Sequence, residues 1–122
     1  MRKYKKYFDI KRKYHKNGKI KSVSNYKKGR LDGLQRLYHE NGYLFAEIQY
    51  RNGFRHGYAN FYNDDGSFSD QNQYQWGKLH GYCYEFSETG FHLEDLFHKG
   101  EWIKSRKCNS LWDTYFHIEK LK

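Results

Sequence analysis

Histidine is the residue type that most readily serves acid–base or metal chemistry, and this chain has seven. His56 and His80 lie 24 residues apart at equivalent turns, whereas His15, His39 and His98 fall in or beside predicted strands. Two histidines without a matching carboxylate or cysteine make a poor zinc ligand set. We therefore interpret His56 and His80 as turn residues that tolerate unusual backbone angles, and we predict no metal site.

The other residue types that carry chemistry form no catalytic pattern. No Ser/His/Asp arrangement, phosphate-cradling glycine motif or zinc motif is visible. Cys83 and Cys108 are too few for a disulfide framework, which favours a reducing, cytoplasmic location. No apolar run approaches the roughly 20 residues of a membrane helix, and the N-terminus lacks the apolar stretch of a signal peptide. We predict a protein that is not an enzyme, with no cofactor and no small-molecule substrate.

Positive charge is concentrated at the N-terminal end. Residues 1–30 hold thirteen Lys and Arg against one acid, Asp9, whereas residues 31–122 hold ten Lys and Arg against thirteen acids. The basic residues alternate with Tyr4, Tyr7, Phe8 and Tyr14. Such a segment can bind phosphates and stack on bases, rest on an anionic membrane, or steer the chain onto an acidic protein. A fourth interpretation is a charged edge that prevents pairing with neighbouring strands.

A repeat of 24 residues positions these side chains. An aromatic column and a glycine column recur four times, at Tyr14, Tyr38, Tyr62, Phe86 and at Gly18, Gly42, Gly66, Gly90. Three more columns recur three times, at Tyr26, Tyr50, Tyr74, at Gly29, Gly53, Gly77 and at Gly33, Gly57, Gly81. Fixed periods of this length are typical of repeat architectures with atypical end units.

Each repeat is predicted to form a β-hairpin. Asn41-Gly42 and Asn52-Gly53 are typical of type I′ turns. Alternation between these turns places Ala46 on the core face of the sheet and Phe45 and Phe61 on the opposite, partly apolar face. An apolar strip on an open face favours a contact surface, while cross-strand pairs that only stiffen the sheet are the alternative.

In residues 109–122 the spacing of apolar residues changes from the strand pattern to a helical one. Ser110 and Asp113 resemble a capping box, and Leu111, Tyr115 and Ile118 recur at helical spacing. We predict a mainly all-β single domain over 1–122: an elongated, curved antiparallel sheet of stacked hairpins with a short C-terminal helix. Residues 1–13 form a basic strand or partial repeat, 14–100 the repeats, and 101–122 a cap that contains the helix.

The columns resemble MORN-type repeats, in the bacterial variant found in small YwqK-like antitoxins. The matching segments are YHKNGKIKSVSNYKKGRLDG (14–33), YHENGYLFAEIQYRNGFRHG (38–57) and YNDDGSFSDQNQYQWGKLHG (62–81), and the resemblance covers about residues 10–100. It implies a curved sheet of stacked hairpins. It also implies an immunity protein or antitoxin that binds a cognate toxin and occludes its active site or its target-binding site.

The expected partner is therefore a protein toxin with an acidic contact surface. Large aromatic residues and arginine are the usual anchors of protein interfaces. The expected contacts are Trp76, Tyr43, Phe45, Phe61, Arg2, Lys3, Lys5, Lys6, Lys11, Arg12 and Lys13. The alternative function is binding of nucleic acid or anionic lipid through the basic N-terminal segment, for which a steep salt dependence is expected.

Overall fold

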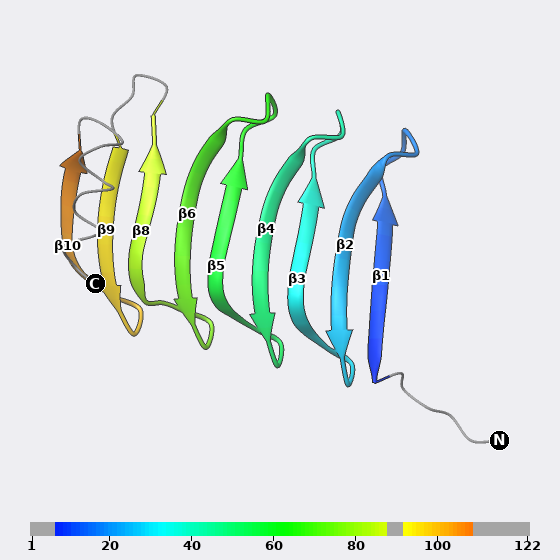
Figure 1. Cartoon of the computed structure of the whole chain (residues 1–122), viewed down its shortest axis with the longest axis horizontal. Coiled ribbons are helices and arrows are strands. Elements are labelled where there is room, and N and C mark those ends of the chain that lie inside the picture. The colour runs from blue at the N-terminus through cyan, green and yellow to red at the C-terminus, as the bar shows by residue number, and fades with distance from the viewer. Residues whose placement is uncertain (1–6, 88–91, 109–122) are drawn as a thin grey trace.

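The computed structural model describes residues 7–87 and 92–108, which form one open antiparallel sheet without a helix (Figure 1). The strands are β1 (Phe8–Tyr14), β2 (Ile20–Lys27), β3 (Arg30–Tyr38), β4 (Leu44–Arg51), β5 (Phe54–Tyr62), β6 (Phe68–Gln75), β7 (Lys78–Leu79), β8 (Gly81–Phe86), β9 (His92–His98) and β10 (Glu101–Cys108). They follow chain order across the sheet, and the short β7 pairs with β6. The prediction of an antiparallel sheet of hairpins is confirmed.

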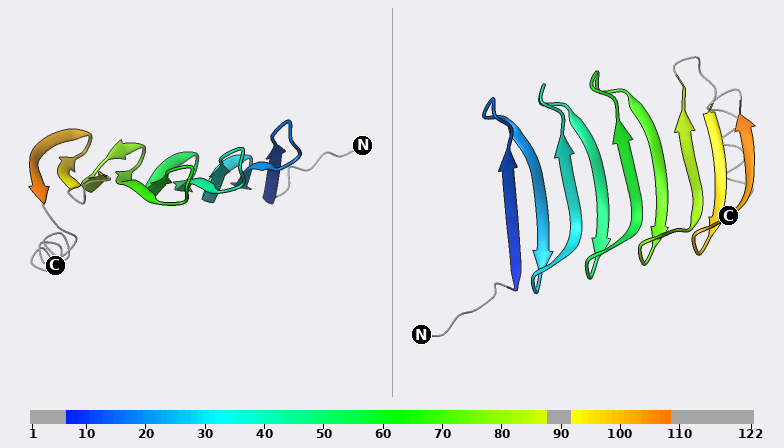
Figure 2. Two further views of the ribbon diagram at one scale, coloured as in Figure 1. Left: turned by 90° about the horizontal axis from the view of Figure 1, so that it is seen from above. Right: turned by 180° about the vertical axis from the view of Figure 1, so that it is seen from behind.

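The sheet is a single layer when it is seen from above (Figure 2). None of the described segments is a helix of membrane-spanning length and apolarity. Residues 101–108, predicted to begin the cap, form the strand β10 instead. The helix predicted within 109–122 lies outside the described residues.

Two-residue turns close the hairpins at the lower end of the strands in Figure 1. Both residues of each turn have positive φ, as a type I′ turn requires. Asn52 and Gly53 have φ of 50° and 85°, so the type I′ prediction for this pair is confirmed. The equivalent turns are Lys28-Gly29, Trp76-Gly77 and Lys99-Gly100. A glycine second residue and the right-handed strand twist make this turn type favourable.

The turn at Asn41-Gly42, at the upper end, is of another kind. Only Gly42 has positive φ, at 97°. The Gly42 N–H donates to the His39 carbonyl at 3.0 Å, and the His39 N–H donates to the Tyr43 carbonyl at 2.8 Å. The Asn41 side-chain oxygen accepts from the Tyr43 N–H at 3.0 Å, which fixes a longer loop. The type I′ prediction was therefore wrong here.

A bulge early in β4 changes the face of every side chain after it. Leu37 pairs with Ala46 and Tyr38 pairs with Leu44, so Phe45 is the extra residue. Because an extra residue reverses the alternation, Leu44 and Ala46 lie on opposite faces. The prediction that separated Phe45 and Phe61 from Ala46 was therefore wrong. Lys21 and Ser69 are the extra residues at the equivalent bulges of β2 and β6.

The two faces of the sheet differ in composition. The buried cluster Ala46, Ile48 and Ala59 packs with Leu37, Tyr50, Phe61 and Tyr74. We call its side the Phe45 face, and its central cross-strand row is Lys13, Ser22, Leu37, Ala46, Phe61, Asp70, Glu85, Leu93 and Lys107. We call the other side the Arg36 face, and its row is Arg12, Val23, Arg36, Glu47, Asn60, Gln71, Tyr84, Glu94 and Arg106.

Turn side chains connect each repeat to the next. At the lower end, Asp32 and His56 accept hydrogen bonds from the N–H groups of Asn52 and Trp76, at 3.1 and 3.2 Å. His80 does the same for Lys99 at 3.0 Å. His56 and His80 are absent from the positive-φ positions, so our interpretation of them as residues with unusual backbone angles was wrong. Their role is to satisfy a backbone donor in the next turn.

Candidate interaction surface

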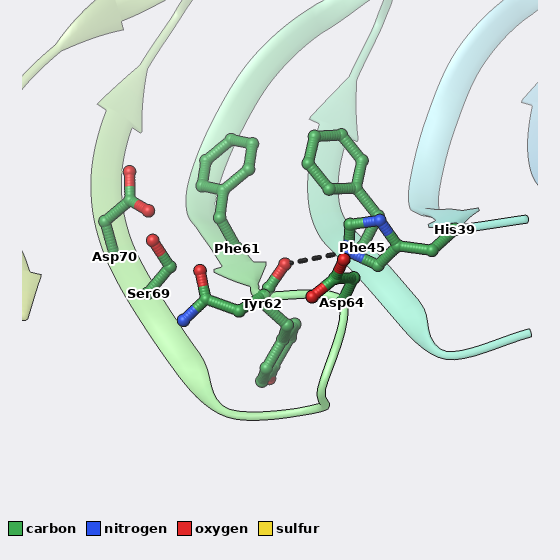
Figure 3. Close-up of a pocket in the computed structure, with 8 residues that line it drawn as sticks. His39, Phe45, Phe61, Tyr62, Asp64, Ser69 and Asp70 are labelled. Carbon is green, nitrogen blue, oxygen red and sulfur yellow. Dashed lines mark hydrogen bonds between the residues drawn. The ribbon is translucent and has the colours of Figure 1, made fainter. Parts of the chain in front are cut away.

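Phe45 and Phe61 lie side by side on the Phe45 face (Figure 3). Their ring centroids are 6.1 Å apart in an edge-to-face arrangement, and the His39 ring lies 5.0 Å from Phe45. The Phe45 side chain is 40% exposed, although it borders a buried cluster. Exposed aromatic rings held in a fixed geometry are effective anchors for a protein partner, because little side-chain entropy is lost on binding.

The two rings open into a pocket of about 490 Å³. His39 Nε2 donates to the Tyr62 carbonyl at 3.0 Å, which fixes the imidazole against the pocket wall (Figure 3). Asp64, Ser69 and Asp70 complete the lining. The pocket therefore has an aromatic side and a polar, acidic side.

A second open pocket, of about 360 Å³, lies on the other side of Phe45. Lys11, Lys13 and Lys21 line it, so β1 and the β2 bulge bring three lysine side chains to one pocket. The Lys11 ammonium also lies 4.5 Å from the centre of the Tyr26 ring, a cation–π distance. We call this the lysine pocket. Phe45 separates it from the pocket with the acidic side.

The structure places the predicted basic contacts of β1 on two different faces of the sheet. Lys11 and Lys13 lie on the Phe45 face, while Arg12 pairs with Val23 on the Arg36 face. Strand alternation makes this separation unavoidable. The other predicted basic contacts, Arg2, Lys3, Lys5 and Lys6, lie outside the described residues.

Beyond Phe61, the Phe45 face carries two carboxylates on directly opposed residues. Asp70 in β6 is the direct cross-strand partner of Glu85 in β8. Like charges directly opposite each other destabilise a sheet. Asp70 and Glu85 therefore place two like charges on neighbouring strands of the Phe45 face.

The polar groups of the Arg36 face, in contrast, satisfy one another. Arg36 Nε lies 3.5 Å from a Glu47 carboxylate oxygen, and the Gln71 amide donates to the Asn60 side-chain oxygen at 2.7 Å. Tyr84 forms a side-chain hydrogen bond with Glu94. Burial, and then the Glu94 charge, raise the pKa of Tyr84. These polar groups of the Arg36 face are therefore paired with one another within the sheet.

Trp76 lies at the other end of the strands from Phe45, in the lower turn between β6 and β7. Its ring is 4.5 Å from His56 and 6.5 Å from Phe54, and the Arg51 guanidinium lies 5.5 Å from it. Trp76 is 47% exposed. Tyr43 lies in an upper turn, where its ring covers Gly66. The structure thus brings together Phe45, Phe61, Lys11 and Lys13, but not Trp76.

Sequence reasoning missed three polar members of this surface: Lys21, Asp70 and Glu85. Lys21, Phe45 and Ser69 are 24 residues apart, so the repeat period could have revealed that they share a position. The opposition of Asp70 and Glu85 required the register between β6 and β8, which only the structure gives.

The remaining chemistry-bearing residues form no further site. Between residues 7 and 108, leaving out 88–91, no three His, Cys, Asp or Glu side chains are placed to hold a metal ion. Cys83 and Cys108 are buried free thiols, and burial raises the pKa of Cys83. In comparisons with protein-family models, curated proteins and solved structures, no match to this chain was found.

Proposed function

We propose that this protein is an immunity protein or antitoxin that binds a cognate protein toxin through the Phe45 face. The observation that carries the proposal is the exposed Phe45 ring, which packs edge-to-face on half-buried Phe61 between the lysine pocket and the Asp70–Glu85 pair. The resemblance of the repeat columns to the antitoxin variant of MORN-type repeats supplies the class of partner. Neutralisation then follows from occlusion of the toxin's active site or target-binding site.

The charge distribution on this face specifies the toxin surface. Lys11, Lys13 and Lys21 require acidic groups on the toxin, whereas Asp70 and Glu85 require basic groups. Apolar toxin side chains would cover Phe45 and Phe61 between them. Such complementarity raises the association rate and excludes partners with the wrong charge order.

The test begins with recovery of the partner from the native host. The full chain with a C-terminal tag would be used as bait after nuclease treatment, and mass spectrometry would identify a stoichiometric protein. The gene of that protein, or an adjacent toxin-like gene, would then be expressed with and without this chain. We expect growth to stop with the toxin alone and to resume on co-expression. Failure to restore growth at equal toxin levels would refute neutralisation.

A further inference from the structure

We propose that the lysine pocket binds a nucleoside phosphate, with the phosphates against the lysines and the base against Phe45. This inference goes beyond the neutralising function and does not depend on it. It rests on three features of the pocket: its cations, its hydroxyl groups and its aromatic wall.

The cations are concentrated and have no internal counter-charge. Lys11, Lys13 and Lys21 line one pocket, and none of them forms an ion pair with a carboxylate among the described residues. Three lysine side chains that line one pocket attract an anion that lies between them. A phosphate chain carries several negative charges and strong acceptor oxygens, so it is the anion that best matches three lysines.

Two nearly buried hydroxyls form the floor of the pocket. Ser22 and Ser24 are 7% and 6% exposed, and they pair directly with Lys13 and Lys11. Gln35 Nε2 donates to Ser24 Oγ at 2.9 Å, so the Ser24 hydrogen is directed elsewhere. Ser22 makes no side-chain hydrogen bond among the described residues. Both hydroxyls can therefore donate to phosphate oxygens, and a buried hydroxyl gains from such a partner.

The aromatic wall selects among phosphorylated ligands. Phe45 lines the pocket opposite the lysines and is 40% exposed, so part of its ring is available for contact. A flat base that stacks on an aromatic ring contributes binding energy without regard to base identity. The volume of about 360 Å³ lies within the range for small-ligand sites. Inorganic phosphate or a sugar phosphate would leave the Phe45 wall unused.

A direct test is an NMR titration of the full chain with ATP, tripolyphosphate and adenosine. We expect ATP to shift the amide signals of Lys13, Ser22, Ser24 and Phe45 in a saturable way. Tripolyphosphate and adenosine should each bind at least about tenfold more weakly than ATP, because each lacks one half of the recognised group. Tripolyphosphate that binds as tightly as ATP would overturn the proposal.

Neighbouring residues of β1 provide matched variants. Lys13→Ala and Arg12→Ala remove the same charge from the same strand, but only Lys13 faces the pocket. We expect Lys13→Ala to raise the Kd for ATP about tenfold and Arg12→Ala to raise it less than about twofold. Equal effects would identify unspecific attraction to a basic edge and would refute the site. Circular dichroism would confirm that both variants fold.

Titration with a short single-stranded oligoadenylate distinguishes the two possible sources of the nucleoside phosphate, a nucleic-acid strand and a free nucleotide. If it shifts the same four signals at lower concentration than ATP, the natural ligand is a nucleic-acid strand; if it binds more weakly, the ligand is a free nucleotide. Either result supports the pocket. Oligoadenylate binding that shifts signals elsewhere and leaves the four unchanged would contradict it.

Discussion

Trp76 is the bulkiest residue at a position where the backbone favours a small one. Its φ is 48°, in the left-handed region, and the equivalent Asn52 has φ 50°. Asn adopts this region more readily than other non-glycine residues, whereas most L-residues lose roughly 1–2 kcal/mol there. A tryptophan retained at that cost is consistent with a contact role.

We therefore expect Trp76→Asn to leave the free energy of unfolding unchanged or raise it by up to about 1 kcal/mol. The same variant should weaken toxin binding if Trp76 is a contact, as the sequence predicts. Urea unfolding and calorimetric titration would measure the two effects. A clear loss of stability would show instead that packing against His56 and Phe54 holds the turn together.

Tyr84 gives a pH-dependent prediction at the residue scale. Burial and the Glu94 charge raise its pKa above the ordinary 10.0, so the folded state keeps the phenol proton when the unfolded chain loses it. This contribution to stability is complete below pH 10 and is lost as the pH rises above it. Tyr84→Phe should cost about 1 kcal/mol at pH 8, through the lost hydrogen bond to Glu94.

The stability difference between wild type and Tyr84→Phe should narrow by pH 11, because the variant has no phenol to ionise. Urea unfolding of both proteins at the two pH values measures this change. An identical difference at pH 8 and pH 11 would show that the Tyr84 phenol is not linked to folding.

At the scale of the element, Gly57 and Gly81 each lie against the side-chain amide of a glutamine on the neighbouring strand. Gly57 has φ 105°, and a Cβ there would lie 2.0 Å from Gln49 Oε1, which accepts from the Tyr58 N–H at 3.1 Å. Gly18 has φ 86° but no heavy atom within 4 Å of its Cβ position. Alanine substitution at Gly57 and at Gly18 therefore distinguishes the cost of backbone strain from the cost of a side-chain clash.

Gly18→Ala should cost about 1 kcal/mol, from the left-handed backbone alone. Gly57→Ala should cost about 2 kcal/mol more, because Gln49 must also move and release the Tyr58 N–H. Thermal or urea unfolding would compare the two variants. Equal losses would mean that the Gln49 contact contributes little to the strand geometry.

The elements also show how far sequence reasoning reached. Period and turn chemistry predicted the antiparallel hairpins and the type I′ turn at Asn52-Gly53, because both depend on local backbone preference. The assignment of side chains to faces failed at Phe45, because a one-residue bulge leaves almost no mark in the sequence yet reverses alternation. The same bulge places Phe45 on the surface that carries Lys13 and Phe61, so the sequence could predict several members of the candidate site but not how they are brought together.

At the scale of the whole molecule, the Phe45 face carries an ordered series of charges along the sheet. Its central row runs from Lys13 through the apolar Leu37, Ala46 and Phe61 to the acidic Asp70 and Glu85, and ends at Leu93 and Lys107. A single-layer sheet leaves such a row accessible, whereas a sandwich would bury it (Figure 2). The N-terminal excess of charge in the sequence therefore becomes one end of an ordered surface.

The most direct measurement is the affinity of the recovered toxin for Phe45→Ala and Tyr58→Ala variants of this chain. The two side chains are similarly exposed, at 40% and 45%, but Tyr58 pairs with Gln73 on the Arg36 face. We predict a loss of at least about 2 kcal/mol, or roughly thirtyfold, for Phe45→Ala and less than about twofold for Tyr58→Ala. Full affinity in the folded Phe45→Ala variant, or a larger loss for Tyr58→Ala, would contradict it.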